Sequence, residues 1–290
     1  MSTEKKSSTV LLDGVVSIDN DKCDINELFG ENLVGKMLSE ELATSDQILQ
    51  IMLNKNVFGI YDEGLAKIMS IHKIRIIIDY NLGNDKLAAT ITDEEGNSVI
   101  AINPNAMSKV TNGYAAITIL HEIVHSLTHN ALTNPKTNED KQFSKNTKSA
   151  FKSFKKIYKK YKQSFQSLWY SFENEREFVA TFVTDRSVRQ ALKNLAIKED
   201  RANKSTLKQT FKDFVNALSD LLLNRKLFLN NLDKYNNLQK ELFEYVYNKP
   251  KTSTNLSSKL NNIIDLYRQS NGGAFVNECA LDRFEDMARR

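Results

Sequence analysis

Cysteine, proline and glycine are scarce in this chain, and each shortage narrows the class of protein. The two cysteines, Cys23 and Cys279, stand far apart and form neither a disulfide framework nor a cysteine zinc pattern. No histidine lies near either of them in the sequence, which argues against a cysteine hydrolase. So few cysteines indicate a reducing compartment. Three prolines and ten glycines in 290 residues favour a protein built mainly of helices.

Long apolar runs are absent as well. No segment approaches the roughly 18 consecutive apolar residues of a membrane span, and the N-terminal sequence MSTEKKSSTV lacks the apolar core of a signal peptide. We therefore expect a soluble protein that has no membrane partner and is not secreted by the usual signal route. The net charge of +4 is too weak to assign a nucleic-acid partner on its own. Glycine-rich nucleotide-binding loops are also missing from the sequence.

The order of hydrophobic patterns predicts an α+β fold that is mostly α. Helical periodicity covers residues 25–42, 45–54 and 62–72, and it is followed by β-branched, strand-like runs at 73–80, 87–92 and 98–103. The last two strands are joined by a predicted hairpin turn at residues 93–97. Beyond these strands the chain is almost wholly helical. The later helices are predicted at 143–165, 187–197, 205–224, 226–247, 254–269 and 274–288.

These patterns divide the chain into three regions. Residues 1–24 form a polar N-terminal segment, residues 25–197 form the domain that contains the sheet, and residues 198–290 form a helical bundle region. Within the middle region, residues 139–166 are expected to be a lysine-rich helical insertion.

Three of the four histidines fall within nine residues, at positions 121, 125 and 129. The sequence His121-Glu122-Ile123-Val124-His125 has the pattern H-E-x-x-H, and it lies in the apolar helical stretch 115–127. Positions i and i+4 share one helix face, so two imidazoles can bind one metal there. Glu122 can then accept the proton of a water on that metal. The pattern predicts zinc as cofactor; the alternative is a solvated helix face without a metal.

A catalytic zinc site usually has a third protein ligand. His129 lies eight residues from His121, about 12 Å along a straight helix, so one metal does not reach both. The subclass with a third histidine follows H-E-x-x-H-x-x-G-x-x-H, but Thr128 and Ala131 stand at the last two defined positions. We therefore expect His129 to support the ligands or to face solvent.

A second helical segment supplies a better candidate. Its sequence, Glu177-Phe178-Val179-Ala180-x-Phe182, resembles the glutamate helix of zinc metallopeptidases of the Glu-ligand, gluzincin-like class. The closest resemblance is to the metallopeptidase-like domains of phage and mobile-element polyvalent proteins. In that group, too, a strand that ends in Asn-Pro precedes the active helix, as Asn103-Pro104 does here, and Thr128 fits the extended motif. The resemblance covers about residues 70–195.

This resemblance implies a set of roles. His121, His125 and Glu177 would be zinc ligands, and Glu122 the general base. Glu173, one turn before Glu177, is the alternative third ligand, and Glu175 lies between them. An edge strand, either 98–103 or its neighbour, would pair with an extended peptide substrate. The location implied is the host-cell cytoplasm or a virion.

The segment between the two motifs is rich in lysine. Nine lysines lie between positions 141 and 162, and no acidic residue occurs from 141 to 172. Aromatic residues repeat at alternating spacings of three and four, at Phe151, Phe154, Tyr158, Tyr161 and Phe165. One interpretation is a solvated helix with its aromatic side packed on the domain. The other is a basic surface for nucleic acid.

The leading functional prediction is a zinc endopeptidase that acts on a protein or peptide substrate. Its oxyanion would be stabilised by a donor such as Tyr170 or His129, with Tyr158 and Tyr161 as further candidates. One alternative is a binding or virion-associated protein that uses a zincin-like domain as a scaffold. Another is a nucleic-acid-associated factor that acts through the lysine-rich helix.

Overall fold

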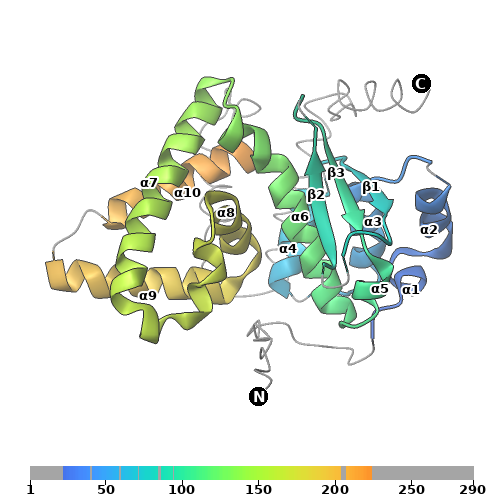
Figure 1. Cartoon of the computed structure of the whole chain (residues 1–290), viewed down its shortest axis with the longest axis horizontal. Helices are drawn as coiled ribbons and strands as arrows, with labels where there is room; N and C mark the ends of the chain where they lie inside the picture. The colour runs from blue at the N-terminus through green and yellow to red at the C-terminus, as the bar shows by residue number, and fades with distance from the viewer. Residues whose placement is uncertain are drawn as a thin grey trace, which may run out of the picture.

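A computed structural model describes residues 22–39, 41–58, 60–70, 72–83, 86–93, 95–203 and 207–223. The fold is α+β and mostly α, as predicted, with a three-stranded sheet on one side and a group of helices on the other (Figure 1). The helices predicted at 226–247, 254–269 and 274–288 lie outside the described residues, as does nearly all of the polar segment 1–24.

The first part of the chain forms four short helices. They are α1 (Ile25–Phe29), α2 (Glu31–Leu38), α3 (Ser45–Asn54) and α4 (Ile60–Met69). The prediction of one helix over residues 25–42 is wrong, because Gly30 has a φ of +83° and separates α1 from α2. The prediction for α3 is confirmed; a capping box between Thr44 and Gln47 fixes its start.

The sheet contains the three predicted strands, β1 (Arg75–Ile78), β2 (Ala88–Thr92) and β3 (Ser98–Ile102). Their order is β1-β3-β2, with β1 parallel and β2 antiparallel to β3. Because β3 is paired on both sides, it has no free edge for the expected peptide, and β2 is an outer strand of the sheet within the described residues. The hairpin turn between β2 and β3 uses Gly96 at a φ of +93°. Asn130 donates a hydrogen bond to the Gly96 carbonyl at 2.8 Å and ties this turn to the next long helix.

That helix, α6 (Asn112–Thr133), carries the H-E-x-x-H sequence and packs against β2 and β3 (Figure 1). It follows a short helix that was not predicted, α5 (Pro104–Met107), and it extends well beyond the predicted range 115–127. Its apolar residues Ile119, Leu120, Ile123 and Val124 are fully buried, as the periodicity predicted. None of the described helices combines the length and the hydropathy of a membrane span.

The remaining helices are α7 (Asn138–Tyr161), η1 (Lys162–Ser164), η2 (Gln166–Leu168), η3 (Tyr170–Phe172), α8 (Glu175–Thr184), α9 (Arg186–Asn203) and α10 (Leu207–Leu223). Of these, α7 and α8 pack against α6, and α9 packs against α7 and α8. Helix α7 starts before the predicted residue 143 because Thr137 and Asp140 form a capping box. It ends at Tyr161, and the 3-10 turn η1 replaces the predicted last turn. The boundary proposed at residue 197 lies inside α9.

The aromatic side of α7 belongs to the core. Phe151, Phe154 and Tyr158 are buried, and α7 packs against α6, α8, α9 and α10. Phe151 and Phe154 both lie against Phe178 of α8, with ring centroids 5.9 and 6.4 Å apart. The packed aromatic side predicted for this helix is therefore confirmed, and α8 is held between α6 and α7.

Candidate metal centre

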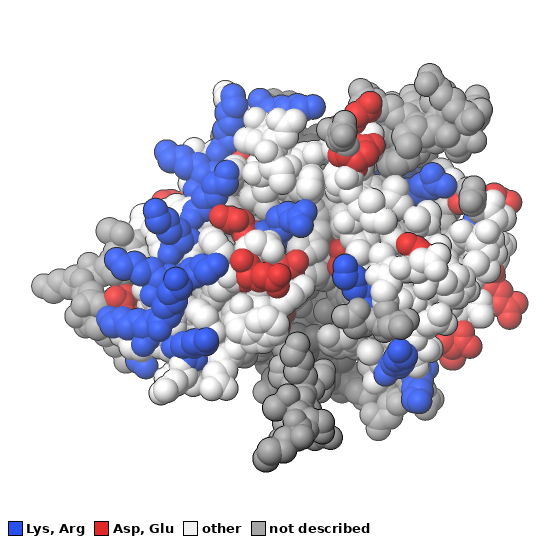
Figure 2. All heavy atoms as spheres, viewed as in Figure 1, with Lys and Arg blue, Asp and Glu red and all other residues white. Residues whose placement is uncertain are grey.

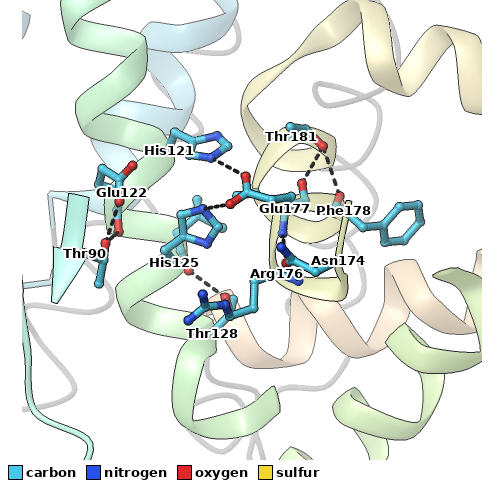
Figure 3. A network of polar contacts seen from close by, with 12 residues as sticks. Thr90, His121, Glu122, His125, Thr128, Asn174, Arg176, Glu177, Phe178 and Thr181 are labelled. Carbon is cyan, nitrogen blue, oxygen red and sulfur yellow. Dashed lines mark hydrogen bonds and ion pairs between the residues drawn. The ribbon is translucent and has the colours of Figure 1, made fainter. Parts of the chain in front are cut away.

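Two histidines of α6 and one glutamate of α8 meet between these helices (Figure 3). The Nε2 atom of His121 lies 3.1 Å from Oε2 of Glu177, and Nε2 of His125 lies 3.3 Å from Oε1 of the same carboxylate. The imidazole rings are 4.6 Å apart and nearly perpendicular. One carboxylate is thus shared by both histidines of the H-E-x-x-H sequence, which lie 56 and 52 residues before it in the chain.

The position of Glu177 follows from the local sequence. Asn174 caps α8 by accepting hydrogen bonds from the backbone N–H groups of Arg176 and Glu177 at 2.9 and 3.0 Å. Phe178 and Phe182 are fully buried, and both rings lie 5.2 Å from Phe214 of α10. A capped start and two buried aromatic anchors hold the first turn of α8, and with it the carboxylate, against α6.

Hydrogen bonding sets the tautomer of His121. The Thr184 hydroxyl has a single proton, and it donates that proton to the Ala180 carbonyl at 2.8 Å. Its oxygen lies 3.3 Å from His121 Nδ1, so the proton of this contact belongs to Nδ1. With its proton on Nδ1, the ring can offer the Nε2 lone pair to a metal ion, or it can donate a hydrogen bond from Nε2 to Glu177 when it carries a second proton. The arrangement of donors therefore suits a metal ion or a second proton at this point.

The side chain of Glu122 lies on the other side of His121, toward the sheet (Figure 3). It is buried, and the hydroxyl of Thr90 on β2 lies 2.8 Å from both its Oε2 atom and its backbone oxygen. Ligand atoms of His121, Glu122 and His125 all lie within 4.8 Å of one another. These three residues form a group that can hold a metal ion.

Charge and burial shift the pKa values of Glu177 and Tyr170. Burial alone would raise the pKa of Glu177, but hydrogen bonds with His121 and His125 outweigh it and hold that pKa well below its usual range. Burial, followed by the charge of Glu177, raises the pKa of Tyr170 far above its usual range. The Tyr170 ring is stacked 6.4 Å from that of His121. The centre therefore contains an ionised carboxylate and a phenol that keeps its proton.

Two other residues predicted for the site, His129 and Glu173, do not join the group of His121, His125 and Glu177. Nδ1 of His129 is 3.3 Å from Nη1 of Arg176 and accepts a hydrogen bond from it. Burial and then the charge of Arg176 lower the pKa of His129, which favours the neutral ring. Glu173 is exposed at the end of η3, and only Glu177 of the three neighbouring glutamates contacts the histidines within the described part of the chain.

Thr90 and Thr184 were not recognised from the sequence. Each contributes a hydroxyl to a predicted site residue, one from β2 and the other from the last turn of α8. A threonine in a strand or at the end of a helix is common, and neither one belongs to a motif. Thr128, which fits the extended motif, donates to the Val124 carbonyl inside α6 instead.

Comparison with known proteins adds no second line of support. No protein family, curated protein or solved structure matches this chain. What is known of the centre is therefore its own geometry: a His-Glu-His group that can hold a metal ion, faced by the carboxylate of Glu177.

Proposed function

We propose that this protein is a zinc-dependent endopeptidase in which His121, His125 and Glu177 hold the metal and Glu122 is the general base. One observation carries the proposal. Both histidine Nε2 atoms of an H-E-x-x-H helix contact the same ionised carboxylate, while the glutamate of the motif is buried beside them.

The spacing of the donor atoms supports zinc. Nitrogen and oxygen donors lie about 2.0–2.1 Å from a tetrahedral zinc ion, so neighbouring donors are about 3.3–3.4 Å apart. The distances of 3.1 and 3.3 Å between the Glu177 oxygens and the two Nε2 atoms are close to this value. Two imidazoles with one carboxylate also form a common ligand set of catalytic zinc, whereas calcium and magnesium prefer oxygen donors.

Each residue then has a chemical task. Zinc held by these ligands would polarise a peptide carbonyl and lower the pKa of a water molecule towards ~7. Glu122 would accept the proton of the attacking water and then give it to the leaving amine. The Thr90 hydroxyl holds the Glu122 carboxylate in place from β2. Glu177 and the two histidines would hold the metal beside this base.

The neighbours of the centre suit a peptide substrate. Tyr170 keeps its proton and lies beside His121, so we propose it, rather than His129, as the donor that stabilises the oxyanion. Strand β2 is at the edge of the sheet and adjoins α6 through Thr90. An extended peptide that pairs with this edge would bind through its backbone, independently of its sequence.

The test compares the peptidase activity of zinc-loaded protein with that of protein stripped of metal by a chelator. Each is incubated with an unfolded polypeptide, and new N-termini are identified by mass spectrometry. We expect cleavage by the zinc-loaded protein alone, with recovery when zinc is returned to the stripped sample. Zinc binding without cleavage would support the scaffold alternative instead.

Replacing Thr184 by valine should weaken zinc binding by about tenfold or more. Valine has nearly the same shape but cannot accept the hydrogen bond from His121 Nδ1, and such outer partners are worth about 10–100-fold in metal affinity. Affinity is measured by competition with a chromophoric chelator. Thr184→Ser, which keeps the hydroxyl, is the matched control and should bind zinc almost as the wild type does. Equal affinity in all three proteins would show that Thr184 has no part in the site.

A further inference from the structure

Helix α7 carries a straight row of lysines on its exposed side (Figure 2). We call the lysine row the six exposed residues Lys141, Lys145, Lys148, Lys152, Lys156 and Lys159. They are separated by steps of three or four residues, so they lie within one narrow face of the helix. From the first to the last residue the row spans about 27 Å.

The excess positive charge of the chain is concentrated in this helix and the residue that follows it. The whole sequence has 40 basic and 36 acidic residues, and nine of the basic ones are the lysines between 141 and 162. Without them the rest of the chain would have 31 basic and 36 acidic residues, a net charge of −5. The mildly positive net charge therefore comes from one surface rather than from a general excess of lysine.

The row is not neutralised by neighbouring carboxylates. Within the described residues, Lys160 alone of these nine lysines forms an ion pair, with Glu199 at 3.2 Å. Five pairs of lysines four residues apart repel one another along the helix, whereas a surface that only had to stay solvated would gain from alternating Glu and Lys. A bound polyanion would relieve this repulsion.

The length of the lysine row and the burial of its neighbours indicate which kind of polyanion fits it. The apolar side of α7 is packed in the core, which leaves no apolar face to enter a membrane. The aromatic residues Phe151, Phe154 and Tyr158 are buried, so they offer no platform for stacking unpaired bases. A length of about 27 Å corresponds to about eight phosphates along one strand of duplex DNA. Lysines contact phosphates as compact charges and lack the planar fork that arginine uses to read guanine.

We propose that the lysine row binds the phosphate backbone of duplex nucleic acid without reading its sequence. This interaction surface is separate from the metal centre, which is formed by other helices, and it does not depend on the proposed peptidase activity. It would place the protein on nucleic acid whether or not the centre is catalytic.

The test measures binding of a fluorescent 24-base-pair DNA duplex of mixed sequence by anisotropy, between 50 and 200 mM salt. The row variant combines four substitutions, Lys145→Gln, Lys148→Gln, Lys152→Gln and Lys156→Gln. The control variant removes four exposed lysines elsewhere, Lys22→Gln, Lys73→Gln, Lys86→Gln and Lys109→Gln. Both variants change the net charge equally. Glutamine is a good helix former, so α7 should stay intact, which circular dichroism checks.

For wild type we expect affinity that falls steeply with salt. Each phosphate contact contributes about 0.9 to the log–log slope, so the row variant should lose about 3 to 4 of it. At 100 mM salt its affinity should be at least about tenfold weaker, and the control should stay within about threefold of wild type. Should the row variant fold poorly, the double variant Lys148→Gln with Lys152→Gln should still lose about 2 of the slope.

Several results would overturn the proposal. They are no salt-dependent binding of duplex by the wild type, an equal loss in the row and control variants, and stronger binding to anionic vesicles or polyglutamate than to duplex. Single-stranded RNA of the same length, bound more tightly than duplex, would likewise contradict it. Zinc content is measured in every variant and should be unchanged, so failure here is distinguishable from failure of the metal centre.

Discussion

Glu122→Gln is expected to lower peptide hydrolysis by at least about 100-fold while zinc stays bound, since general-base catalysis contributes about 10²–10⁴-fold. The glutamine oxygen can still accept the hydrogen bond from Thr90, so the fold around α6 should persist. The amide cannot accept the proton of a water molecule, and this is the step assigned to the Glu122 carboxylate. Hydrolysis is measured on the zinc-loaded proteins with the same unfolded substrate.

The control for this variant is Glu175→Gln, because Glu175 lies in the first turn of α8 but makes no contact with the histidines within the described residues. It should retain nearly full activity. A Glu122→Gln protein that stays within a few-fold of wild type would place the chemistry elsewhere. Loss of zinc together with activity would mean that Glu122 is a ligand rather than the base.

Glu177→Ala is expected to weaken zinc binding by about two orders of magnitude or more. It removes the third donor of the site and leaves two imidazoles without their shared carboxylate. Alanine also favours helix, so α8 should keep its capped start at Asn174. Zinc affinity is measured by competition with a chelator, and zinc content by elemental analysis after dialysis.

Three further variants make the Glu177→Ala result interpretable. Glu175→Ala, two residues before Glu177 on another face of α8, should bind zinc as the wild type does. His121→Ala should fall to background zinc content. If Glu177→Ala kept its zinc and Glu173→Ala lost it, the metal would have selected the exposed glutamate, and the helix register inferred from the sequence would be off by one turn.

The sequence predicted the parts of the centre that follow from local periodicity. His121 and His125 lie on one face of a helix because four residues make about one turn, and Phe178 and Phe182 mark the buried side of α8 in the same way. Their meeting at Glu177 was inferred from a resemblance, since no local pattern shows that a residue 52 positions away will reach the same point.

Features that depend on tertiary packing or on a single dihedral angle could not be predicted. Thr90 and Thr184 act through their hydroxyls because β2 and α8 are packed against α6, which no local pattern reveals. Gly30 ends a helix through its positive φ, although glycine inside a helical pattern is often tolerated. The helix expected to reach Phe165 ends at Tyr161, and 3-10 turns keep Phe165 against the core.

The most direct test of the metal centre is X-ray diffraction from zinc-loaded crystals at the zinc absorption edge. We expect one anomalous peak between α6 and α8, about 2.0–2.1 Å from Nε2 of His121, Nε2 of His125 and a carboxylate oxygen of Glu177. Glu122 should lie beside the peak without binding it. A peak bonded to Glu122 while Glu177 is turned away, or no peak at the two histidines, would contradict the account.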